Sequence, residues 1–450
     1  MASDSSFTLF CYFCGAMTVK EIYRKFKECT GVTTDSRKCG PGLMFFALKG
    51  ERFDGNEFVR GALEQGCPYA VMDNAALYDA SDERMIHVDN VLDTLQKVAA
   101  YHRCQLGTPV IGITGTNGKT TTKELTNAVM STTYKVLCTQ GNLNNSIGVP
   151  LTVLGLKKEH QYAIVEMGAS HPGDIKELVE VSQPDYGLIT NVGKAHLLGF
   201  GSFEGVKRTK GELYDWLREH NGTAFVNRDN VHLQQMCTGL PLIEYGKPGQ
   251  EGLLVEGEVL ECNPFVKFRW RCAGGVWHVV QTNLIGAYNV DNGLAAITVG
   301  LKFGVPEDKA SAAVAGYVPQ NNRSQLTETG RNHLVVDAYN ANPTSMAAAI
   351  ENFRMMKADN KMLILGDMRE LGDVSQAEHR NIVTLLKEGG FTDVWLVGSE
   401  FTNAAKESGF RLFPDVDEVN KVLEKEKVTG RTILIKGSNS IGLTKTITNL

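Results

Sequence analysis

The sequence predicts an α/β protein of three domains built on parallel sheets, and three observations support this. The length of 450 residues is enough for three domains of ordinary size, each with its own core. Short apolar runs alternate with helix-like segments, a pattern typical of parallel, doubly wound sheets. A polar, breaker-rich stretch at Gln105–Pro109 is typical of a linker. We therefore expect domains at residues 1–104, 105–322 and 323–450.

The first domain is predicted from short elements after about Val19. Leu43–Leu48 and Tyr69–Met72 have the apolar, β-rich character of strands, and Glu57–Gln65 between them favours a helix. Together they indicate a small α/β domain. The residues before it, 1–16, are interpreted as a disordered or upstream-start extension, with Met17 as a plausible alternative start.

The second domain opens with an apolar strand at Val110–Thr114, a glycine loop and a helix at about Lys119–Ser131. Further strands are expected at Tyr162–Val165, Gly187–Thr190 and Thr223–Val226. Alternating apolar and basic residues between Leu253 and Leu284, with glycines at 274 and 275, predict an antiparallel hairpin. We expect this hairpin to be an appendage to the parallel sheet.

The third domain again alternates strands with helices, which predicts another parallel sheet. Strands are expected at His333–Asp337, Lys361–Leu365, Val394–Val397 and Thr432–Ile435. Helices are expected after Pro343 and at about Gln376–Leu386.

Composition narrows the possible partners. The chain is 42% hydrophobic and 22% charged with a formal net charge of −5, so nothing indicates a nucleic-acid surface. No apolar run approaches the ~20 residues that span a bilayer, so no membrane insertion is expected. Of the ten cysteines, only Cys11 and Cys14 have CxxC spacing, without the further ligands of a zinc site. Scattered free cysteines favour a reducing cytoplasm.

The most specific chemical signal is a phosphate-binding loop between the strand and the helix of the second domain. Its glycines let backbone N–H groups surround a polyphosphate, and the helix directs its positive end at the same point. Lys119 would neutralise phosphate charge and Thr120 could ligate magnesium. The strict pattern requires glycine where Ile113 stands, so the loop matches only at its Gly-Lys-Thr end; a plain strand-to-helix turn is the alternative. The predicted nucleotide contacts are Thr114, Gly115, Thr116, Asn117, Gly118, Lys119, Thr120 and Thr121.

Two further side chains follow strands and are candidates for magnesium. Glu166 would emerge at the carboxyl edge of the sheet, where open α/β folds bind ligands, and His196 follows another strand. Taken alone, such a glutamate is often a surface residue and a lone histidine is more often a bystander than a ligand. Lys210, taken alone, is a solvated helix lysine.

Several strings of the sequence occur together in one known family. They are the loop at 114–121, Gln140–Gly148, Gly286–Asn292, Asp337–Ser345, Leu365–Gly372 and Lys436–Asn439. With them the chain resembles the Mur ligases from about Thr33 to Gly442. The resemblance implies a central P-loop parallel-sheet ATPase domain, flanked by a small N-terminal α/β UDP-binding domain and a C-terminal Rossmann-like domain.

The resemblance also implies roles for individual residues. Lys119, Glu166, His196 and Lys210 would be catalytic, with Thr120, Glu166, His196 and Lys210 at the two magnesium sites and Lys210 carbamylated. ATP would further contact Asn289, Asn292, Arg323 and Asp337, although Tyr288 stands where the family commonly has histidine. Substrate contacts are implied for Asp35, Ser36, Arg37, Phe46, Lys49, Gly50, Asn142, Asn144, Asn145, Tyr339, Asn340, Asn342, Ser345 and Lys436.

By this resemblance the chain would be a cytoplasmic, monomeric, ATP-dependent ligase that adds D-alanyl-D-alanine to UDP-MurNAc-tripeptide through an acyl phosphate. Three alternatives remain. A sister ligase would add a single amino acid, and a folylpolyglutamate-type enzyme would lack the UDP-sugar domain. A nucleotide-driven switch protein would form no bond, and a GTP-specific one would need an Asn-Lys-x-Asp segment, which we do not find. A non-catalytic binding subunit is disfavoured because all the expected positions are filled.

Overall fold

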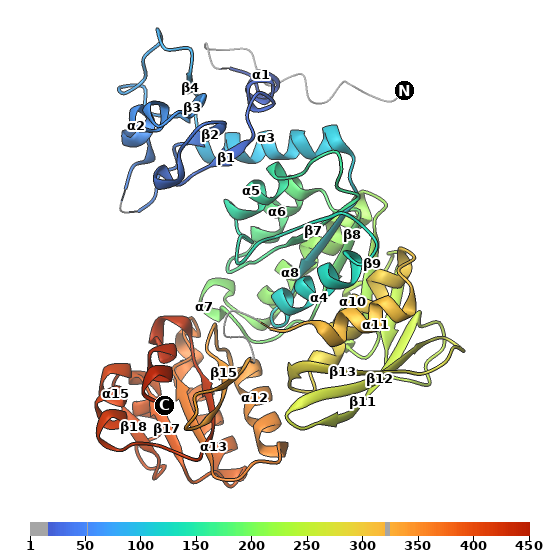
Figure 1. The fold of residues 1–450 in the computed structure, drawn as a ribbon, viewed down its shortest axis with the longest axis vertical. Helices are drawn as coiled ribbons and strands as arrows, with labels where there is room; N and C mark the ends of the chain where they lie inside the picture. The colour runs from blue at the N-terminus through green and yellow to red at the C-terminus, as the bar shows by residue number, and fades with distance from the viewer. Residues whose placement is uncertain (1–16, 52, 320–324) are drawn as a thin grey trace. The chain divides into compact units, whose positions relative to one another are not determined.

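The computed structural model describes residues 17–51, 53–319 and 325–450, and its helices and strands form the α/β architecture predicted from the sequence (Figure 1). The predicted extension at 1–16 and the predicted ATP contact Arg323 lie outside these residues. The chain forms two compact units. The first comprises residues up to Gly112 with Lys135–Met167 and Glu177–Pro184; the second comprises Ile113–Tyr134, Gly168–Lys176 and Asp185–Leu450.

The first unit contains a four-stranded parallel sheet. Its strands lie in the order β1 (Gly31–Thr33), β2 (Leu43–Phe46), β3 (Tyr69–Met72) and β4 (Met85–His87). The predicted helix at Glu57–Gln65 is divided into a 3₁₀ turn, Gly55–Phe58, and α2, Val59–Glu64. Helices α1 (Val19–Phe26) and α3 (Val91–Leu106) complete the small α/β domain.

The predicted linker at Gln105–Pro109 is wrong at its first two residues. Helix α3 continues to Leu106 and ends at Gly107, whose φ of 64° lies in the left-handed region that glycine tolerates. The sequence placed the start of the linker too early, because Gln105 and Leu106 are compatible with a helix and the helix ends only at the glycine.

The second sheet has nine strands, and its strand β5 contains residues of both compact units. Its order is β13 (His278–Ile285), β12 (Phe265–Cys272), β11 (Val255–Cys262), β10 (Leu242–Gly246), β9 (Thr223–Asn227), β8 (Tyr186–Ile189), β5 (Val110–Thr114), β7 (Tyr162–Glu166) and β6 (Val136–Cys138). The expected appendage is instead a three-stranded antiparallel meander that continues the sheet, because β11 pairs in parallel with β10.

Helices α4 (Lys119–Met130) and α10 (Asn289–Lys302) pack closely within the second unit. A Cβ at Gly300 would lie 2.4 Å from Val129 Cγ1, so glycine permits this approach. Helices α5 (Gly148–Leu154) and α6 (Asp174–Ser182) and, later in the chain, α7 (Leu197–Phe200), α8 (Phe203–Glu219), α9 (Val231–Met236) and α11 (Glu307–Gly316) connect the strands.

The C-terminal sheet has six strands, all parallel except the first. Their order is β14 (Gln325–Glu328), β15 (His333–Asp337), β19 (Thr432–Lys436), β16 (Lys361–Gly366), β17 (Val394–Val397) and β18 (Arg411–Phe413). Helices α12 (Pro343–Met355), α13 (Ser375–Glu388), α14 (Ser399–Ala404) and α15 (Val416–Lys425) alternate with them. Two apolar cores flank the sheet, one containing Phe353 and Leu386 and the other Trp395 and Leu423. Among the described residues, no helix is both long and apolar enough to cross a membrane.

Candidate functional site

The phosphate-binding loop follows β5 and is held in place by the end of β8. The backbone N–H of Asn117 donates to Asn191 Oδ1 at 3.0 Å, while Asn191 Nδ2 and Thr190 Oγ1 donate to the Asn117 carbonyl at 3.0 and 2.6 Å. The Thr116 N–H donates to the Asn191 carbonyl at 2.9 Å. These bonds fix the loop before any ligand arrives.

Glycine is required at two positions of this loop. Gly115 has a φ of +142°, and a Cβ there would lie 2.0 Å from Thr190 Oγ1. Gly118 has a φ of +78°, and a Cβ there would lie 2.7 Å from Asn292 Oδ1. Gly118 also begins α4 without a side-chain cap. The first turn of α4 therefore begins at a glycine, and a helix N-terminus of this kind suits an anion.

Lys119 starts helix α4 and its amine turns back onto the loop. Its Nζ donates to the carbonyls of Gly115 and Thr116, both at 2.9 Å. The next residue, Thr120, is buried, and Thr121 is half-buried. The amine of Lys119 thus lies over the glycine loop, and its contact with phosphate oxygens stays a prediction.

His196 and Lys210 share an electrostatic neighbourhood with Lys119. Burial lowers the pKa of Lys210 well below its usual value, and the charge of Lys119 lowers it further. The Lys210 amine lies 3.5 Å from the Ala169 carbonyl and over the Phe200 ring. Burial likewise lowers the pKa of His196, while the Glu370 carboxylate raises it and the two lysines lower it. The fold thus gathers three of the four predicted catalytic residues around the phosphate loop.

Helices and loops around the C-terminal sheet contribute side chains to the same place. Asn342 Nδ2 donates to Asn117 Oδ1 of the phosphate loop at 2.8 Å. Lys194 Nζ pairs with Glu378 Oε1 at 2.7 Å, and His196 Nδ1 is in close contact with Glu370 Oε2. The predicted substrate residue Asn342 thus also joins this sheet to the nucleotide loop.

Asn342 has a second structural task. It caps helix α12, accepting the Ser345 N–H, while Ser345 Oγ accepts the Asn342 N–H. This reciprocal cap fixes both side chains at the helix N-terminus. Any contact of Asn342 or Ser345 with substrate, as predicted, would be made by side chains that already form this helix cap.

Asp337 and Lys436 form a buried ion pair at the carboxyl edge of the C-terminal sheet. The parallel register of β15 and β19 places the two residues side by side. Lys436 is 1% exposed, and its amine donates to Asp337 Oδ2 at 2.6 Å and to the Asn340 carbonyl at 3.2 Å. Lys436 therefore holds the turn that carries Tyr339 and Asn340, in addition to the substrate contact predicted for it.

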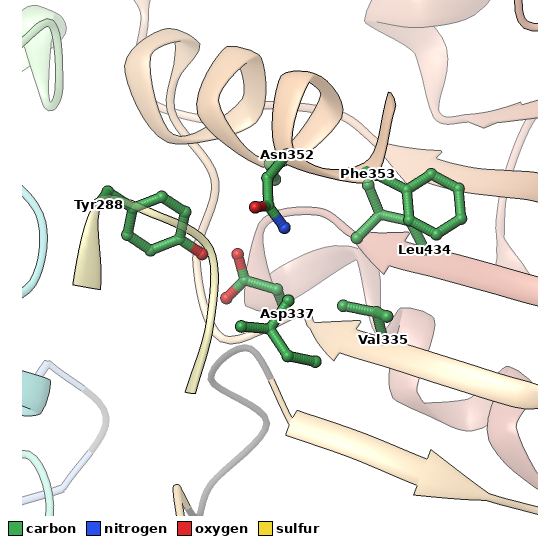
Figure 2. Close-up of a pocket in the computed structure, with 8 residues that line it drawn as sticks. Tyr288, Val335, Asp337, Asn352, Phe353 and Leu434 are labelled. Atoms are coloured by element: carbon green, nitrogen blue, oxygen red, sulfur yellow. The ribbon is translucent and has the colours of Figure 1, made fainter. Parts of the chain in front are cut away.

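A pocket lies next to this pair, between the end of β13 and helix α12 (Figure 2). Tyr288 forms one wall, and Figure 2 shows its hydroxyl and the Asn352 carboxamide on either side of the Asp337 carboxylate. Phe353 and Leu434 provide an apolar base. The empty volume of the pocket is about 250 Å³, so in this conformation it is too small to enclose a nucleoside.

Asn289 and Asn292 lie at the start of α10 and are buried. Asn292 Oδ1 accepts from Thr122 of α4 at 3.0 Å, Asn292 Nδ2 donates to Asn289 Oδ1 at 2.8 Å, and Asn289 Nδ2 donates to the Ile285 carbonyl at 2.9 Å. Their amides link the helix that follows the phosphate loop to the strand beside the pocket.

In the first unit, the predicted UDP-sugar residues lie on loops after β1 and β2. Arg37 is 87% exposed and makes two bonds of 2.9 Å to the Asp35 carboxylate, which hold the pKa of Asp35 at about 2. Ser36 is half-buried in the same turn, and Lys49 and Gly50 are exposed. Phe46, by contrast, is fully buried in the sheet, so its side chain offers no surface to a ligand.

The same unit contains Glu166 and the predicted muramoyl-peptide segment. Glu166 ends β7 and is buried, and its Oε1 accepts from Asn144 Nδ2 at 2.8 Å. Asn145 accepts the N–H of Gly148 at 2.9 Å, while Asn142 is exposed. The structure thus connects a predicted magnesium residue to a predicted substrate residue.

Sequence reasoning missed two contributors to the site. Asn191 belongs to the string that contains His196, and its place after a strand could have indicated a loop-supporting role. Glu370 lies in the string Leu365–Gly372, but no local pattern relates it to His196 because the two are far apart in the sequence.

Comparisons with known proteins cover most of the chain. Family models match as the Mur ligase family catalytic domain over residues 28–103, the Mur ligase middle domain over 113–300 and the Mur ligase glutamate ligase domain over 322–439. The UDP-N-acetylmuramoyl-tripeptide–D-alanyl-D-alanine ligase of Bacillus subtilis (strain 168) is 34% identical over 431 residues, 93% of each protein. The enzyme of that name in Escherichia coli (strain K12) is 33% identical over 92% of each.

Solved structures agree in fold. A crystal structure of MurF from Acinetobacter baumannii superposes with a TM-score of 0.84 at 31% identity, covering 93% of this chain and 92% of the other. The MurF ligase of Thermotoga maritima in complex with ADP gives 0.83 at 26% identity, covering 94% and 97%.

Proposed function

Because the chain belongs to the Mur ligase family, we propose that it is an ATP-dependent ligase that joins D-alanyl-D-alanine to UDP-MurNAc-tripeptide. The observation that carries the proposal is the bond between Asn117 of the phosphate loop and Asn342, which caps helix α12 beside the C-terminal sheet. It connects a nucleotide-binding loop to the part of the chain matched by the glutamate ligase model. A switch protein that only hydrolyses nucleotide has no need of this second set of residues.

The first chemical step activates the carboxylate of the tripeptide. A carboxylate repels nucleophiles and has no usable leaving group, so one of its oxygens attacks the γ-phosphorus of ATP. The bond from this phosphorus to the β-γ bridging oxygen breaks, ADP departs with the electron pair, and an acyl phosphate forms. Lys119 and the first-turn N–H groups of α4 stabilise the charge on the transferring group. Arg323, outside the described residues, is proposed to assist.

The second step forms the amide. The free amine of D-alanyl-D-alanine attacks the acyl carbon to give a tetrahedral species, which loses a proton from nitrogen and expels phosphate. Acyl phosphates hydrolyse readily, so the site has to exclude water during this step. We propose that the loop carrying Tyr339 and Asn340, fixed by Lys436, contacts the incoming dipeptide.

We propose that magnesium binds with ATP at the phosphate loop. Among the described residues no group of three His, Cys, Asp or Glu side chains forms a metal site by itself, so phosphate oxygens would have to complete the coordination. Thr120 offers a hydroxyl at the first turn of α4, and His196 offers a ring nitrogen. Bound there with ATP, the ion would neutralise phosphate charge. The family resemblance also implies Glu166 as a magnesium ligand, and two ions are proposed in all.

Lys210 is proposed to carry a carbamate. An amine reacts with carbon dioxide only when it is unprotonated, and burial favours that form of Lys210. The product is an anion that could hold the second magnesium. A carbamate carbon signal on a protein equilibrated with labelled bicarbonate, absent from Lys210→Ala, would support this assignment. Lack of the signal in both proteins would remove it.

The first unit is proposed to bind the UDP-linked substrate. Asp35, Arg37 and Lys49 present charged groups next to exposed surface, and Asn142, Asn144 and Asn145 are proposed to meet the muramoyl peptide. ATP and UDP-linked precursors are supplied in the cytoplasm, which is where we place the reaction. A monomer is part of the proposal, and sedimentation equilibrium would test it.

The decisive experiment measures phosphate release from ATP and magnesium with UDP-MurNAc-tripeptide, with and without D-alanyl-D-alanine, and the mass of the product. We expect release to require both substrates and the product to be heavier by the dipeptide. Release that responds to a single amino acid instead would identify a sister ligase. Release that ignores both acceptors would leave a nucleotide hydrolase.

A further inference from the structure

A group of polar side chains lies at the carboxyl edge of the four-stranded sheet in the first unit. Lys49 and Asp54 pair in an isolated antiparallel bridge after β2, and Asp73 directly follows β3. Strands β2 and β3 are neighbours, so these loops meet. Open α/β folds bind ligands at this edge, where the turn with Asp35 and Arg37 also follows β1. The group therefore lies where a ligand of this domain is expected.

Asn56 is the buried centre of this group, with 2% of its surface exposed. Its Nδ2 donates to Asp54 Oδ1 at 2.6 Å and to Asp73 Oδ1 at 2.9 Å. Its Oδ1 accepts the N–H groups of Asp73 and Asn74 at 3.0 and 3.2 Å. Both donors and both lone pairs of the amide are thus used, which fixes its orientation. One side chain thereby clamps the loops after β2 and β3 together.

The two carboxylates that Asn56 clamps are also fixed from other directions. Asp54 caps the 3₁₀ turn that follows it by accepting the Asn56 N–H at 2.9 Å. Asp73 Oδ2 accepts the N–H of Val91, at the start of α3, at 3.3 Å. Burial raises the pKa of Asp54, but the bonds from Asn56 and the charge of Lys49 outweigh it and lower the pKa overall. Asp54 is therefore an anion at neutral pH.

Lys49 is tethered to these carboxylates from one side. Its Nζ lies 3.6 Å from Asp54 Oδ2 and 3.9 Å from Asp73 Oδ1. Both distances are longer than those of a good hydrogen bond, so the attraction is mainly electrostatic. The lysine side chain is 56% exposed, whereas those of Asp54 and Asp73 are 27% and 16% exposed. The amine therefore keeps N–H groups for a ligand on its exposed side.

The tether is of more use to binding than to folding. Asp54 and Asp73 already have amide donors, and an exposed ion pair adds little to stability. A free lysine side chain samples many rotamers, and a ligand that orders it loses binding free energy in doing so. Two fixed carboxylates that restrict Lys49 beforehand reduce this loss.

We propose that Asn56 is a positioning residue for Lys49. By clamping Asp54 and Asp73, it holds the Lys49 ammonium in place for the diphosphate of the UDP-linked substrate. A diphosphate is the anionic part of that substrate, and a lysine meets phosphate as a point charge. The inference rests on the proposed function, because it concerns how the first unit holds the substrate of that reaction.

The test uses the full chain and two readouts that need no catalysis. UDP affinity is measured by calorimetry in Asn56→Ala, in Lys49→Met and in the double variant. The mobility of lysine side chains is read from ¹³C relaxation at their ε carbons, with Lys49→Met used to assign the signal and the exposed Lys38 as a reference. Leu63→Ala is the matched control, because it removes a buried apolar side chain from the core of the same domain and leaves the polar group intact.

We expect Asn56→Ala to bind UDP about three- to tenfold more weakly, the effect of freeing one long side chain. Lys49→Met should lose about tenfold or more, because it removes the charge itself. The double variant should bind no worse than Lys49→Met, since Asn56 acts through that lysine. In the unaltered protein Lys49 should be less mobile than Lys38, and Asn56→Ala should remove the difference. Leu63→Ala should change neither readout.

Lys49 as mobile as Lys38 in the unaltered protein would overturn the proposal, and this measurement does not depend on the folding of Asn56→Ala. So would additive losses in the double variant, which would mean that Asn56 affects binding by another route. An equal loss in Leu63→Ala would mean that domain stability alone matters, and would also overturn it. The ligase assay is separate. A chain that binds UDP in this way but joins no dipeptide keeps the inference and loses the proposed function, and a ligase whose UDP affinity ignores Asn56 does the reverse.

Discussion

Replacing Lys436 by methionine tests whether the buried pair with Asp337 holds the C-terminal sheet edge together. Methionine is similar in length and apolar, so the change removes the charge and the donor without opening a large cavity. It leaves the Asp337 carboxylate, whose side chain is only 19% exposed, without the 2.6 Å bond to the amine. The Asn340 carbonyl also loses its donor.

The magnitude follows from this burial. Removing one partner of a fully buried pair costs about 3–5 kcal/mol, because the other charge remains uncompensated. Asp337 retains some access to water, so we expect about 2–3 kcal/mol. Since 1.4 kcal/mol corresponds to a factor of ten, the opening equilibrium of this sheet edge should rise roughly 30- to 150-fold.

Native-state hydrogen exchange, read on peptides from β15 and β19, measures this local opening without assuming that the whole chain unfolds in one step. Lys361→Met is the matched control: Lys361 lies on the neighbouring strand β16, and its amine donates to the exposed Arg354 carbonyl. We expect a change below about 1 kcal/mol there. Adding Asp337→Asn to Lys436→Met should recover part of the loss. A Lys436→Met effect no larger than that of the control would refute the reasoning.

Two further predictions concern the phosphate loop and pH. Gly115→Ala should abolish ADP binding in calorimetry, because the strained φ costs about 1–3 kcal/mol and the new Cβ would lie 2.0 Å from Thr190 Oγ1. The control variant Gly61→Ala, which places its Cβ in open space, should bind ADP normally. Tight ADP binding by Gly115→Ala would contradict the loop geometry. Burial lowers the pKa of His379, so this histidine takes up a proton at a higher pH in the unfolded chain than in the folded one. Its contribution to stability is therefore present above its ordinary pKa and is lost as the pH falls below that value. Protection of the Met368 amide should therefore decrease from pH 7 to pH 5 in the unaltered protein and less in His379→Gln; equal decreases would exclude His379 as the cause.

The phosphate loop could be predicted from the sequence because its chemistry is local. Gly115, Gly118 and Lys119 act within a few residues of one another, and an apolar strand before them fixes their setting. The alternation of strands and helices gave the α/β class for the same reason. Short, half-buried strands such as β14 and β18 were not predicted, because segments of four and three residues show too little alternation of apolar and polar residues.

The contacts of the C-terminal sheet with the loop could not be predicted in this way. Asn342, the cap of α12, meets Asn117 through the packing of distant segments. Lys436 likewise meets Asp337 within the C-terminal sheet through strand order and register. A sequence pattern contains no record of which distant strand becomes a neighbour. Phe46 shows the opposite failure: its string matched the family, but β2 lies inside the sheet and Met44, Phe45 and Phe46 are all buried, so the side chain has no exposed surface.

Three side-chain contacts join the helices and loops of the C-terminal domain to the loop region, and the Leu198 N–H donates to the Glu370 carbonyl beside them. The contact on the phosphate loop itself, Asn117 with Asn342, uses uncharged amides, and a neutral pair neither attracts nor repels a polyphosphate. The other two contacts have exposed members: Lys194, which pairs with Glu378, is 53% exposed, and Glu370, which meets His196, is 57% exposed. The second is an ion pair only when His196 is protonated. Exposed ion pairs contribute about 0–1 kcal/mol each and a hydrogen bond about 1 kcal/mol, so the three together supply only a few kcal/mol. Docking held by so little free energy can be reversed in each catalytic cycle, and a nucleotide that adds contacts to both sides can decide when it occurs.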